Sequence, residues 1–304
     1  MRALVSRQSA PFAELAEVPD PEPRPDEALV EVKAFSLNRG ETRRLETLEA
    51  GTVTGWDLAG IVRRPAADGG PGEGARVVGL MNAGAGVELA AVKVEHLAEL
   101  PDGITFEQAA TLPVAGLTAL RSLEVVGFVL GKRVLITGAS GGVGRFAIQL
   151  AKLAGAHVTG IARRTDGLTE LGADELRPEI EPDGPVYEAI LDAVGGPVLG
   201  TAIARVAPGG TVVSFASTLP DPVAYPAREL FARAPGARLY GFYVFSELEH
   251  TRSGSADLRR LADLVAERKL DPQIDLTLPW SEAQDAIEAL LDRRVNGKAV
   301  LTVN

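Results

Sequence analysis

The feature that most constrains this chain is the glycine-rich turn 138–144, which lies between an apolar segment and an amphipathic one. The apolar, partly β-branched run 134–137 before the turn is typical of a buried strand. The segment 145–154 has apolar residues at near-helical spacing, Gly155 ends it, and 157–161 has the pattern of a second strand. A strand, a glycine turn, a helix and a strand within about 30 residues form the βαβ unit that holds a dinucleotide pyrophosphate.

The glycines of this turn suit a pyrophosphate, which must lie against backbone N–H groups at the positive end of a helix dipole. A Cβ at Gly141 or Gly142 would hold the phosphates away, and Gly144 lets the helix pack closely on the strand. Alanine replaces the first glycine of the usual fingerprint, at Ala139. The residues predicted to bind the cofactor here are Ser140, Gly141, Gly142 and Val143. The alternative is an ordinary turn of an α/β protein that binds nothing.

The end of the second strand indicates which dinucleotide binds. An NAD-binding unit places Asp or Glu about 20 residues along the chain, where it accepts hydrogen bonds from the ribose 2′-hydroxyl. Arg163 and Arg164 stand at this position, and the next carboxylate is Asp166. Because guanidinium groups suit the geometry of a 2′-phosphate, the sequence predicts NADP(H) as the cofactor. The alternative is that both arginines are solvated surface charges.

Composition argues against several classes of function. The chain has 41 acidic and 31 basic residues and a net charge of −10, which argues against nucleic acid or an anionic membrane as a partner. It has no cysteine, which excludes disulfides, thiolate zinc sites and cysteine nucleophiles. The first residues lack the apolar core of a signal peptide, and no apolar run approaches the length of a membrane span. We therefore expect a cytoplasmic enzyme.

The chain shows two patterns, and its 304 residues are enough for two domains. Short alternating strands fill 1–116 and indicate a small antiparallel, barrel-like domain. Strand–helix alternation over 117–270 indicates a doubly wound parallel sheet. The β pattern returns in 271–304, which we expect to rejoin the first domain. Within the second domain, the apolar segment 238–245 is predicted to be one long edge strand.

The order of these motifs resembles the medium-chain dehydrogenase/reductase superfamily, in its zinc-free quinone oxidoreductase branch. Besides the glycine turn, the matching stretches are 36–40, 55–60, 100–103, 112–119, 191–196 and 297–301. The resemblance implies an α/β fold in which a GroES-like β-barrel domain, 1–116 and 271–304, is split around a Rossmann domain, 117–270. It places the active site in the cleft between the two domains.

Zinc-dependent members of the superfamily hold their catalytic metal with a cysteine and a histidine. This chain has no cysteine, and His96, His157 and His250 are scattered, so no metal site is predicted. The chemistry that remains is hydride delivery to an acceptor that is already electron-poor, such as a quinone or an α,β-unsaturated carbonyl (enone). Two alternatives stay open: an enoyl-thioester reductase, and a non-catalytic NADPH-binding sensor or structural protein.

The resemblance also implies where the rest of the cofactor binds. Asn38 and Thr118 are expected near the nicotinamide half, the alternatives being a turn-forming asparagine and a helix-surface threonine. The carboxyl ends of three successive strands supply Ala193, Val194, Phe215, Ala216, Ser217, Phe242, Tyr243 and Val244. Asn296, before the last strand, completes the predicted cofactor-binding set. For Asn296 and the residues from Phe215 to Val244, a core or turn role is the alternative.

The resemblance does not identify a catalytic acid. Relatives in this branch often carry a tyrosine five residues after the asparagine, and here that position is Arg43. Arg43 either polarises a substrate carbonyl or is a solvated helix charge. The candidates for catalysis are therefore Asn38, Arg43 and Tyr243. Because the strand at 238–245 pairs with its symmetry mate in relatives, the resemblance also implies a homodimer.

Overall fold

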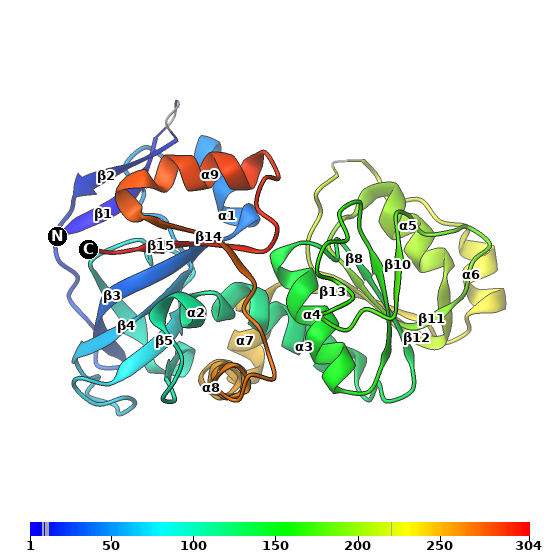
Figure 1. Ribbon diagram of the computed structural model, residues 1–304, viewed down its shortest axis with the longest axis horizontal. Coiled ribbons are helices and arrows are strands. Elements are labelled where there is room, and N and C mark those ends of the chain that lie inside the picture. The colour runs from blue at the N-terminus through cyan, green and yellow to red at the C-terminus, as the bar shows by residue number, and fades with distance from the viewer. Residues whose placement is uncertain (8, 10–11, 220) are drawn as a thin grey trace. The chain divides into compact units, whose positions relative to one another are not determined.

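The computed structural model describes residues 1–7, 9, 12–219 and 221–304 (Figure 1). The chain divides into two compact units. Unit 1 consists of Met1–Leu117 and Leu248–Asn304, and unit 2 consists of Thr118–Glu247. No helix in the described ranges is long and apolar enough to cross a membrane.

Unit 1 is built on β-structure that is antiparallel except for one parallel pair, 274–279 with 298–302. Strands β1 (Arg2–Ser6) and β2 (Ala13–Glu17) form a two-stranded sheet. A seven-stranded sheet has the order β14-β15-β3-β4-β5-β7, with β6 paired to β3. Its strands are β3 (Glu27–Leu37), β4 (Asp57–Arg64), β5 (Arg76–Leu80), β6 (Leu89–Lys93), β7 (Leu97–Glu99), β14 (Ile274–Pro279) and β15 (Lys298–Thr302). Strand β15 pairs with β3, so the C-terminal segment forms part of the same sheet as the N-terminal segment.

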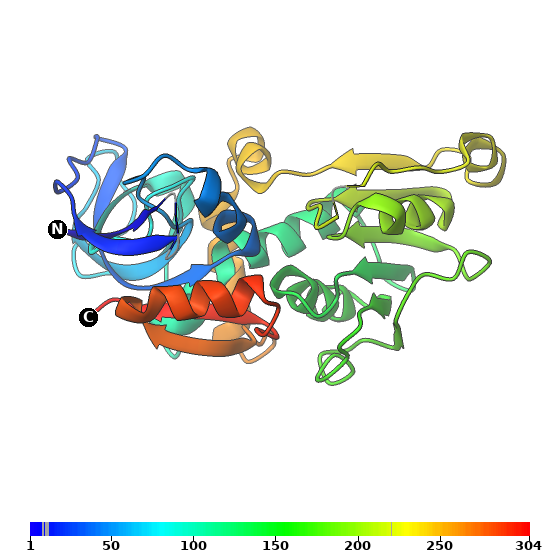
Figure 2. The same cartoon turned by 90° about the horizontal axis from the view of Figure 1, so that it is seen from above.

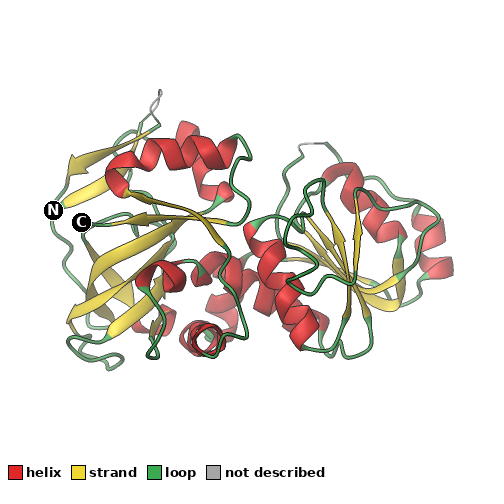
Figure 3. Ribbon diagram, in the orientation of Figure 1, coloured by secondary structure: helices red, strands yellow, loops and turns green. Residues whose placement is uncertain are grey.

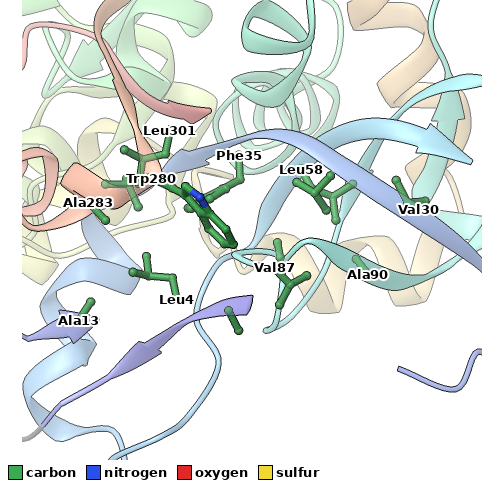
Figure 4. Packing of buried hydrophobic residues seen from close by; sticks show 14 of the residues in the cluster. Leu4, Ala13, Val30, Phe35, Leu58, Val87, Ala90, Trp280, Ala283 and Leu301 are labelled. Atoms are coloured by element: carbon green, nitrogen blue, oxygen red, sulfur yellow. The ribbon is translucent and has the colours of Figure 1, made fainter. Parts of the chain in front are cut away.

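The apolar residues of unit 1 pack between its sheets and helices. Phe35 of β3 meets Trp280 edge-on, with ring centroids 6.4 Å apart, and Figure 4 shows both among Leu4, Leu58 and Val87. Its helices and helical turns are α1 (Arg39–Arg44), η1 (Leu45–Thr47), η2 (Val94–His96), α2 (Phe106–Ala110), η3 (Leu112–Gly116), α8 (Gly254–Ala266), η4 (Trp280–Glu282) and α9 (Ala283–Leu291). Helix α7 (Val244–Thr251) runs across the boundary between the units.

The division differs from the predicted ranges at residues 248–270, which belong to unit 1 and not to the parallel-sheet domain. Helix α8 packs on β5, β7, η2 and η3, all of unit 1. Its apolar stripe is buried there, and a Cβ on Gly116 of η3 would lie only 3.0 Å from Leu261 Cδ1. An amphipathic pattern indicates a helix, but it does not indicate which sheet the apolar face covers.

Unit 2 contains a six-stranded sheet in the order β10-β9-β8-β11-β12-β13, and every neighbouring pair in it is parallel. Its strands are β8 (Arg133–Thr137), β9 (His157–Ile161), β10 (Glu175–Arg177), β11 (Tyr187–Asp192), β12 (Val206–Ser214) and β13 (Arg238–Gly241). Its helices are α3 (Leu117–Val126), α4 (Gly142–Leu153), α5 (Gly196–Ala204) and α6 (Ala227–Arg233). Helices lie on both sides of this sheet, α4 on one and α5 on the other (Figure 3). The predicted fold class, a doubly wound parallel sheet with an antiparallel second domain, is confirmed.

The predicted strand 238–245 is too long. Strand β13 ends at Gly241, and α7 begins at Val244. Val244, Phe245 and Leu248 are buried at helical spacing. The apolar run therefore joins a short strand to the first turn of a helix, which hydrophobicity alone does not separate. Figure 2 shows β13 at the outer edge of its sheet.

Candidate functional site

The glycine turn lies between β8 and α4, as predicted. Gly138 has a φ of +62°, and the Gly141 N–H donates to Gly138 O at 2.9 Å. A Cβ on Gly144 would lie 2.5 Å from Gly138 O and 2.7 Å from Ala139 Cα, so only glycine lets α4 approach the turn this closely. The first amides of a helix have no partner within the helix. This end of α4 can therefore offer N–H groups and a positive dipole end to an anion.

The alanine that replaces the first glycine of the fingerprint is accommodated by a glycine on the neighbouring strand. Ala139 is fully buried, and a Cβ on Gly160 of β9 would lie 3.2 Å from the Ala139 Cβ. The missing side chain at Gly160 leaves the space that Ala139 occupies. The departure from the fingerprint is thus compensated within the βαβ unit.

The two central strands of the sheet are joined at their carboxyl ends by a buried pair. Thr137 Oγ1, at the end of β8, donates to Asp192 Oδ1 of β11 at 2.6 Å. The Gly195 N–H donates to Asp192 Oδ2 at 3.0 Å, and burial raises the pKa of Asp192 while these hydrogen bonds oppose the rise. The order of the strands reverses between β8 and β11, which is where open α/β sheets bind their ligands.

Several predicted cofactor residues gather around this reversal. A Cβ on Gly138 would lie 3.2 Å from Ala193 Cβ and 3.7 Å from Val194 Cγ2. The segment after β12 runs beside them, since the Thr218 N–H donates to Val194 O at 2.8 Å. A Cβ on Gly195 would lie 2.3 Å from Ser217 Oγ. The structure therefore brings the glycine turn, Ala193, Val194 and Ser217 together at the carboxyl ends of the strands.

The residues after β13 also lie at the carboxyl ends of the strands, next to the end of β12. The Phe242 N–H donates to Ser214 O at 2.8 Å. Phe242 and Val244 are buried, whereas Tyr243 is 55 % exposed and its ring lies 5.3 Å from that of Phe245. Of these predicted residues, Tyr243 is the one whose side chain has a large exposed surface. On the segment between them, Phe215 is half-buried and Ala216 is exposed.

The two arginines predicted to select NADP(H) follow β9 directly. Both Arg163 and Arg164 are exposed. Sequence reasoning missed a third arginine, Arg145, which lies in the first turn of α4 and is only 3 % exposed. Its Nη2 donates to Asp166 O at 2.8 Å and its Nε donates to Ser140 O at 3.3 Å. The available signal was a cation at the N-terminus of a helix, where the dipole disfavours positive charge.

In unit 1, the predicted residue Asn38 belongs to a polar cluster with Glu41, Asp57 and Lys298. Asn38 Nδ2 donates to Asp57 Oδ2 at 2.8 Å and to Glu41 Oε1 at 3.1 Å, and Asn38 Oδ1 accepts from Lys298 Nζ at 2.8 Å. The Asn38 N–H also donates to Glu41 Oε1, at 2.7 Å, at the start of α1. Since both amide hydrogens of Asn38 are engaged, its side chain can offer a ligand only the second lone pair of Oδ1.

This cluster holds two carboxyl groups and one ammonium out of water. Glu41 is 7 % exposed, Lys298 2 % and Asp57 0 %. Burial, reinforced by the charge of Asp57, raises the pKa of Glu41 to about 8, so Glu41 is mostly protonated at pH 7. Burial lowers the pKa of Lys298, although both carboxyl groups oppose this. Glu41 Oε2 has no hydrogen-bond partner within the described part of the chain.

The remaining predicted residues have mixed settings. Arg43 is exposed on α1, and Thr118 is buried in α3 and so is not a helix-surface residue. The Asn296 N–H donates to Asp275 Oδ2 at 2.7 Å, and Asn296 Oδ1 is buried without a partner among the described residues. Asn38, Arg43 and Asn296 belong to unit 1, and the other predicted residues belong to unit 2. Across the residues that the structure describes, no group of three or more His, Asp or Glu side chains is placed to hold a metal ion.

Comparisons with known proteins place the chain among oxidoreductases. Residues 168–301 match the protein family described as zinc-binding dehydrogenase. The chain is 31 % identical to the chloroplast envelope quinone oxidoreductase homolog of Arabidopsis thaliana, over 95 % of this chain and 93 % of that protein. It is 30 % identical to 2-methylene-furan-3-one reductase of Solanum lycopersicum, over 92 % of this chain and 73 % of that protein. The solved structure of the quinone oxidoreductase from Coxiella burnetii has a TM-score of 0.84 and 29 % identity, covering 100 % of this chain and 99 % of that one.

Proposed function

Because this chain belongs to the medium-chain dehydrogenase/reductase superfamily, in its quinone oxidoreductase branch, we propose that it is an NADPH-dependent reductase of quinones or α,β-unsaturated carbonyls. The family is one of NAD(P)H-dependent oxidoreductases. One observation carries the proposal. At the carboxyl ends of the parallel strands, the glycine turn, Ala193, Val194 and the segment 215–218 come together where the strand order reverses.

The residues at these strand ends fit NADPH. Gly144 lets the N-terminus of α4 stand close to the turn, and its amides suit the pyrophosphate. Arg163 and Arg164 are exposed and suit a 2′-phosphate through paired N–H donors. When bound, NADPH supplies the hydride. The dinucleotide is held in one orientation along the carboxyl ends of the strands by Ala193, Val194 and the strand ends beside them.

Quinones and enones suit a site that contributes orientation more than acid catalysis. In both, the substrate's own carbonyl oxygen takes the charge that develops on reduction. The relative from tomato is named as a reductase of a methylene-furanone, which is an enone, and the Arabidopsis relative is named as a quinone oxidoreductase homolog. These names support one chemistry, the reduction of an electron-poor conjugated carbonyl. Arg43 and Tyr243, both exposed, remain the candidates for a hydrogen bond to that oxygen.

The test is NADPH oxidation by the purified protein with benzoquinones, naphthoquinones, alkenals and enoyl thioesters, each repeated with NADH. We expect turnover with quinones or alkenals, and weaker turnover with NADH. Turnover confined to enoyl thioesters would overturn the substrate assignment. Tight NADPH binding with no turnover on any compound would identify a binding protein instead of a reductase.

We further propose that the protein is a homodimer through β13. All four residues of β13 are exposed, and one of its two edges has no partner strand among the described residues. Pairing of two such edges about a two-fold axis would cover Leu239, which is 56 % exposed. A cytoplasmic location stays a prediction from the sequence.

A further inference from the structure

We propose that Arg145 is a positioning residue that sets the preference for NADPH over NADH by fixing the loop that carries Arg163 and Arg164. This inference rests on the proposed function and deepens it, because it names how the cofactor is selected. It gives a role to a buried arginine that the glycine fingerprint does not include.

Arg145 joins two backbone segments within unit 2. Its Nη2 donates to Asp166 O at 2.8 Å, and its Nε donates to Ser140 O at 3.3 Å. Ser140 belongs to the glycine turn, and Asp166 follows Arg163 and Arg164 in the loop after β9. One side chain therefore sets the spacing between the turn suited to the pyrophosphate and the loop suited to the 2′-phosphate.

The loop is held at its other end by the same turn. The Ala139 N–H donates to Ile161 O at 3.1 Å, at the end of β9. Arg163 and Arg164 lie exposed between this hydrogen bond and the one made by Arg145. A loop fixed at both ends loses less conformational entropy when its arginines close on an anion. Removal of Arg145 breaks the hydrogen bond that it makes to this loop at Asp166 O.

Arg145 holds this place at an electrostatic cost. A cation in the first turn of a helix opposes the helix dipole, and at 3 % exposure it also loses most of its hydration. The two carbonyl groups offset part of this cost. Arg145 therefore acts through its link between Ser140 O and Asp166 O, and not through its own charge.

The first test measures dissociation constants of NADPH and NADH by calorimetry for the wild type, Arg145→Gln and Arg145→Lys. We expect the ratio of the NADH to the NADPH constant to fall about tenfold in both variants, the size of one lost charge-assisted hydrogen bond. Lysine keeps the charge and most of the stem, so it should fold, but one ammonium does not reproduce the forked donor geometry. Adenosine 2′,5′-bisphosphate and 5′-AMP should repeat the result for the adenosine half alone.

The second test asks whether Arg145 acts through the loop. In an Arg163→Gln/Arg164→Gln background, substitution of Arg145 should change the NADH-to-NADPH ratio less than twofold. Lys152→Gln removes a cation from the same helix, where Lys152 pairs with Asp174, and should leave the ratio unchanged. Backbone amide hydrogens of residues 162–168 should exchange faster in the ligand-free Arg145→Lys protein than in the ligand-free wild type.

Two failures are distinguishable. A wild type that binds NADH as tightly as NADPH would overturn the cofactor assignment under the proposed function. A wild type that prefers NADPH, with a preference that survives both Arg145 substitutions, would overturn only the role of Arg145. An undiminished effect of Arg145 substitution in the double-glutamine background would show that the residue acts by its charge and not through the loop.

Discussion

At the scale of single residues, unit 1 keeps a carboxyl group protonated in its interior. Ionising both Glu41 and Asp57 would place two negative charges beside the one positive charge of Lys298. An uncompensated buried charge costs several kcal/mol. Glu41 therefore keeps its proton up to a pKa of about 8, against an ordinary value of 4.5. The same carboxyl accepts from the Asn38 N–H, so its protonation state is tied to the start of α1.

We expect Glu41 to make the free energy of unfolding decrease between about pH 5 and pH 8. In this interval the folded protein holds a proton that the unfolded chain has released, so a rise in pH favours unfolding. The contribution is fully present below pH 4.5 and is lost as the pH passes 8. Glu41→Gln should remove this pH dependence. The decrease in the free energy of unfolding over the whole interval amounts to a few kcal/mol at most. Urea unfolding at several pH values in the interval measures it.

Glu46→Gln is the matched control, because Glu46 lies on the adjoining η1 and is exposed. The comparison is between slopes, since glutamine also places an amide where Glu41 Oε2 has no partner. Lys298, with its lowered pKa, contributes the opposite slope at alkaline pH, so the measurement stops at about pH 8. Parallel profiles for Glu41→Gln and the wild type would rule out Glu41 as the titrating group.

At the scale of elements, β8, β9 and the glycine turn share one packing arrangement, in which Ala139 of the turn faces Gly160 of β9. We expect Gly160→Ala to destabilise the protein by about 1–3 kcal/mol through overpacking. Its Cβ would lie 3.2 Å from Ala139 Cβ and 3.0 Å from Leu176 Cδ2. Adding Ala139→Gly should recover part of the loss, because it relieves the first contact and leaves the second. Urea unfolding of the two single variants and the double variant measures the coupling.

Gly72→Ala serves as the control, because a Cβ there meets nothing within 4 Å. If the loss of unfolding free energy in the double variant equalled the sum of the losses in the two single variants, Ala139 and Gly160 would not share this space. The NADPH dissociation constant of the double variant, which restores the usual first glycine, should stay within about threefold of wild type.

The elements that could be predicted from the sequence are those whose pattern is local. The βαβ unit, with its turn at Gly141 and Gly144, depends on spacing along one stretch, and the structure has it where the pattern indicates. The strand ends after β11 and β12 could be placed because parallel strands finish at one edge. The strand at 238–245 could not be bounded, because its apolar residues continue into α7.

The residues that sequence reasoning missed act through distant partners. Lys298 meets Asn38 across 260 positions of the chain, and nothing near Lys298 in sequence signals this contact. Arg145 meets Asp166 only because β9 returns the chain beside α4. The resemblance indicates Asn38 as a cofactor residue. In the structure its backbone N–H bonds to Glu41 of α1 and its side-chain amide bonds to Asp57 of β4.

At the scale of the whole molecule, the free edge of β13 predicts the state of association, since no strand of the described residues pairs with it. Strand β13 pairs with β12 on one side, and its side chains Leu239 and Tyr240, which point to opposite faces of the sheet, are exposed. Such an edge invites pairing with another chain, and natural proteins that stay monomeric protect theirs with charge. Two copies pairing their β13 strands about a two-fold axis would continue the sheet and close the assembly at a dimer.

We therefore expect the wild type to sediment as a dimer at micromolar concentration and Leu239→Lys to sediment as a monomer. A lysine at this position places a charge, in both copies, within the paired edge, where it would be desolvated. Leu153→Lys is matched in exposure, 52 % against 56 % for Leu239, and lies on α4, so it should remain dimeric. Sedimentation velocity across a hundredfold concentration range measures all three. A monomeric wild type, or a Leu239→Lys dimer as stable as the wild type, would show that the edge of β13 is not the interface.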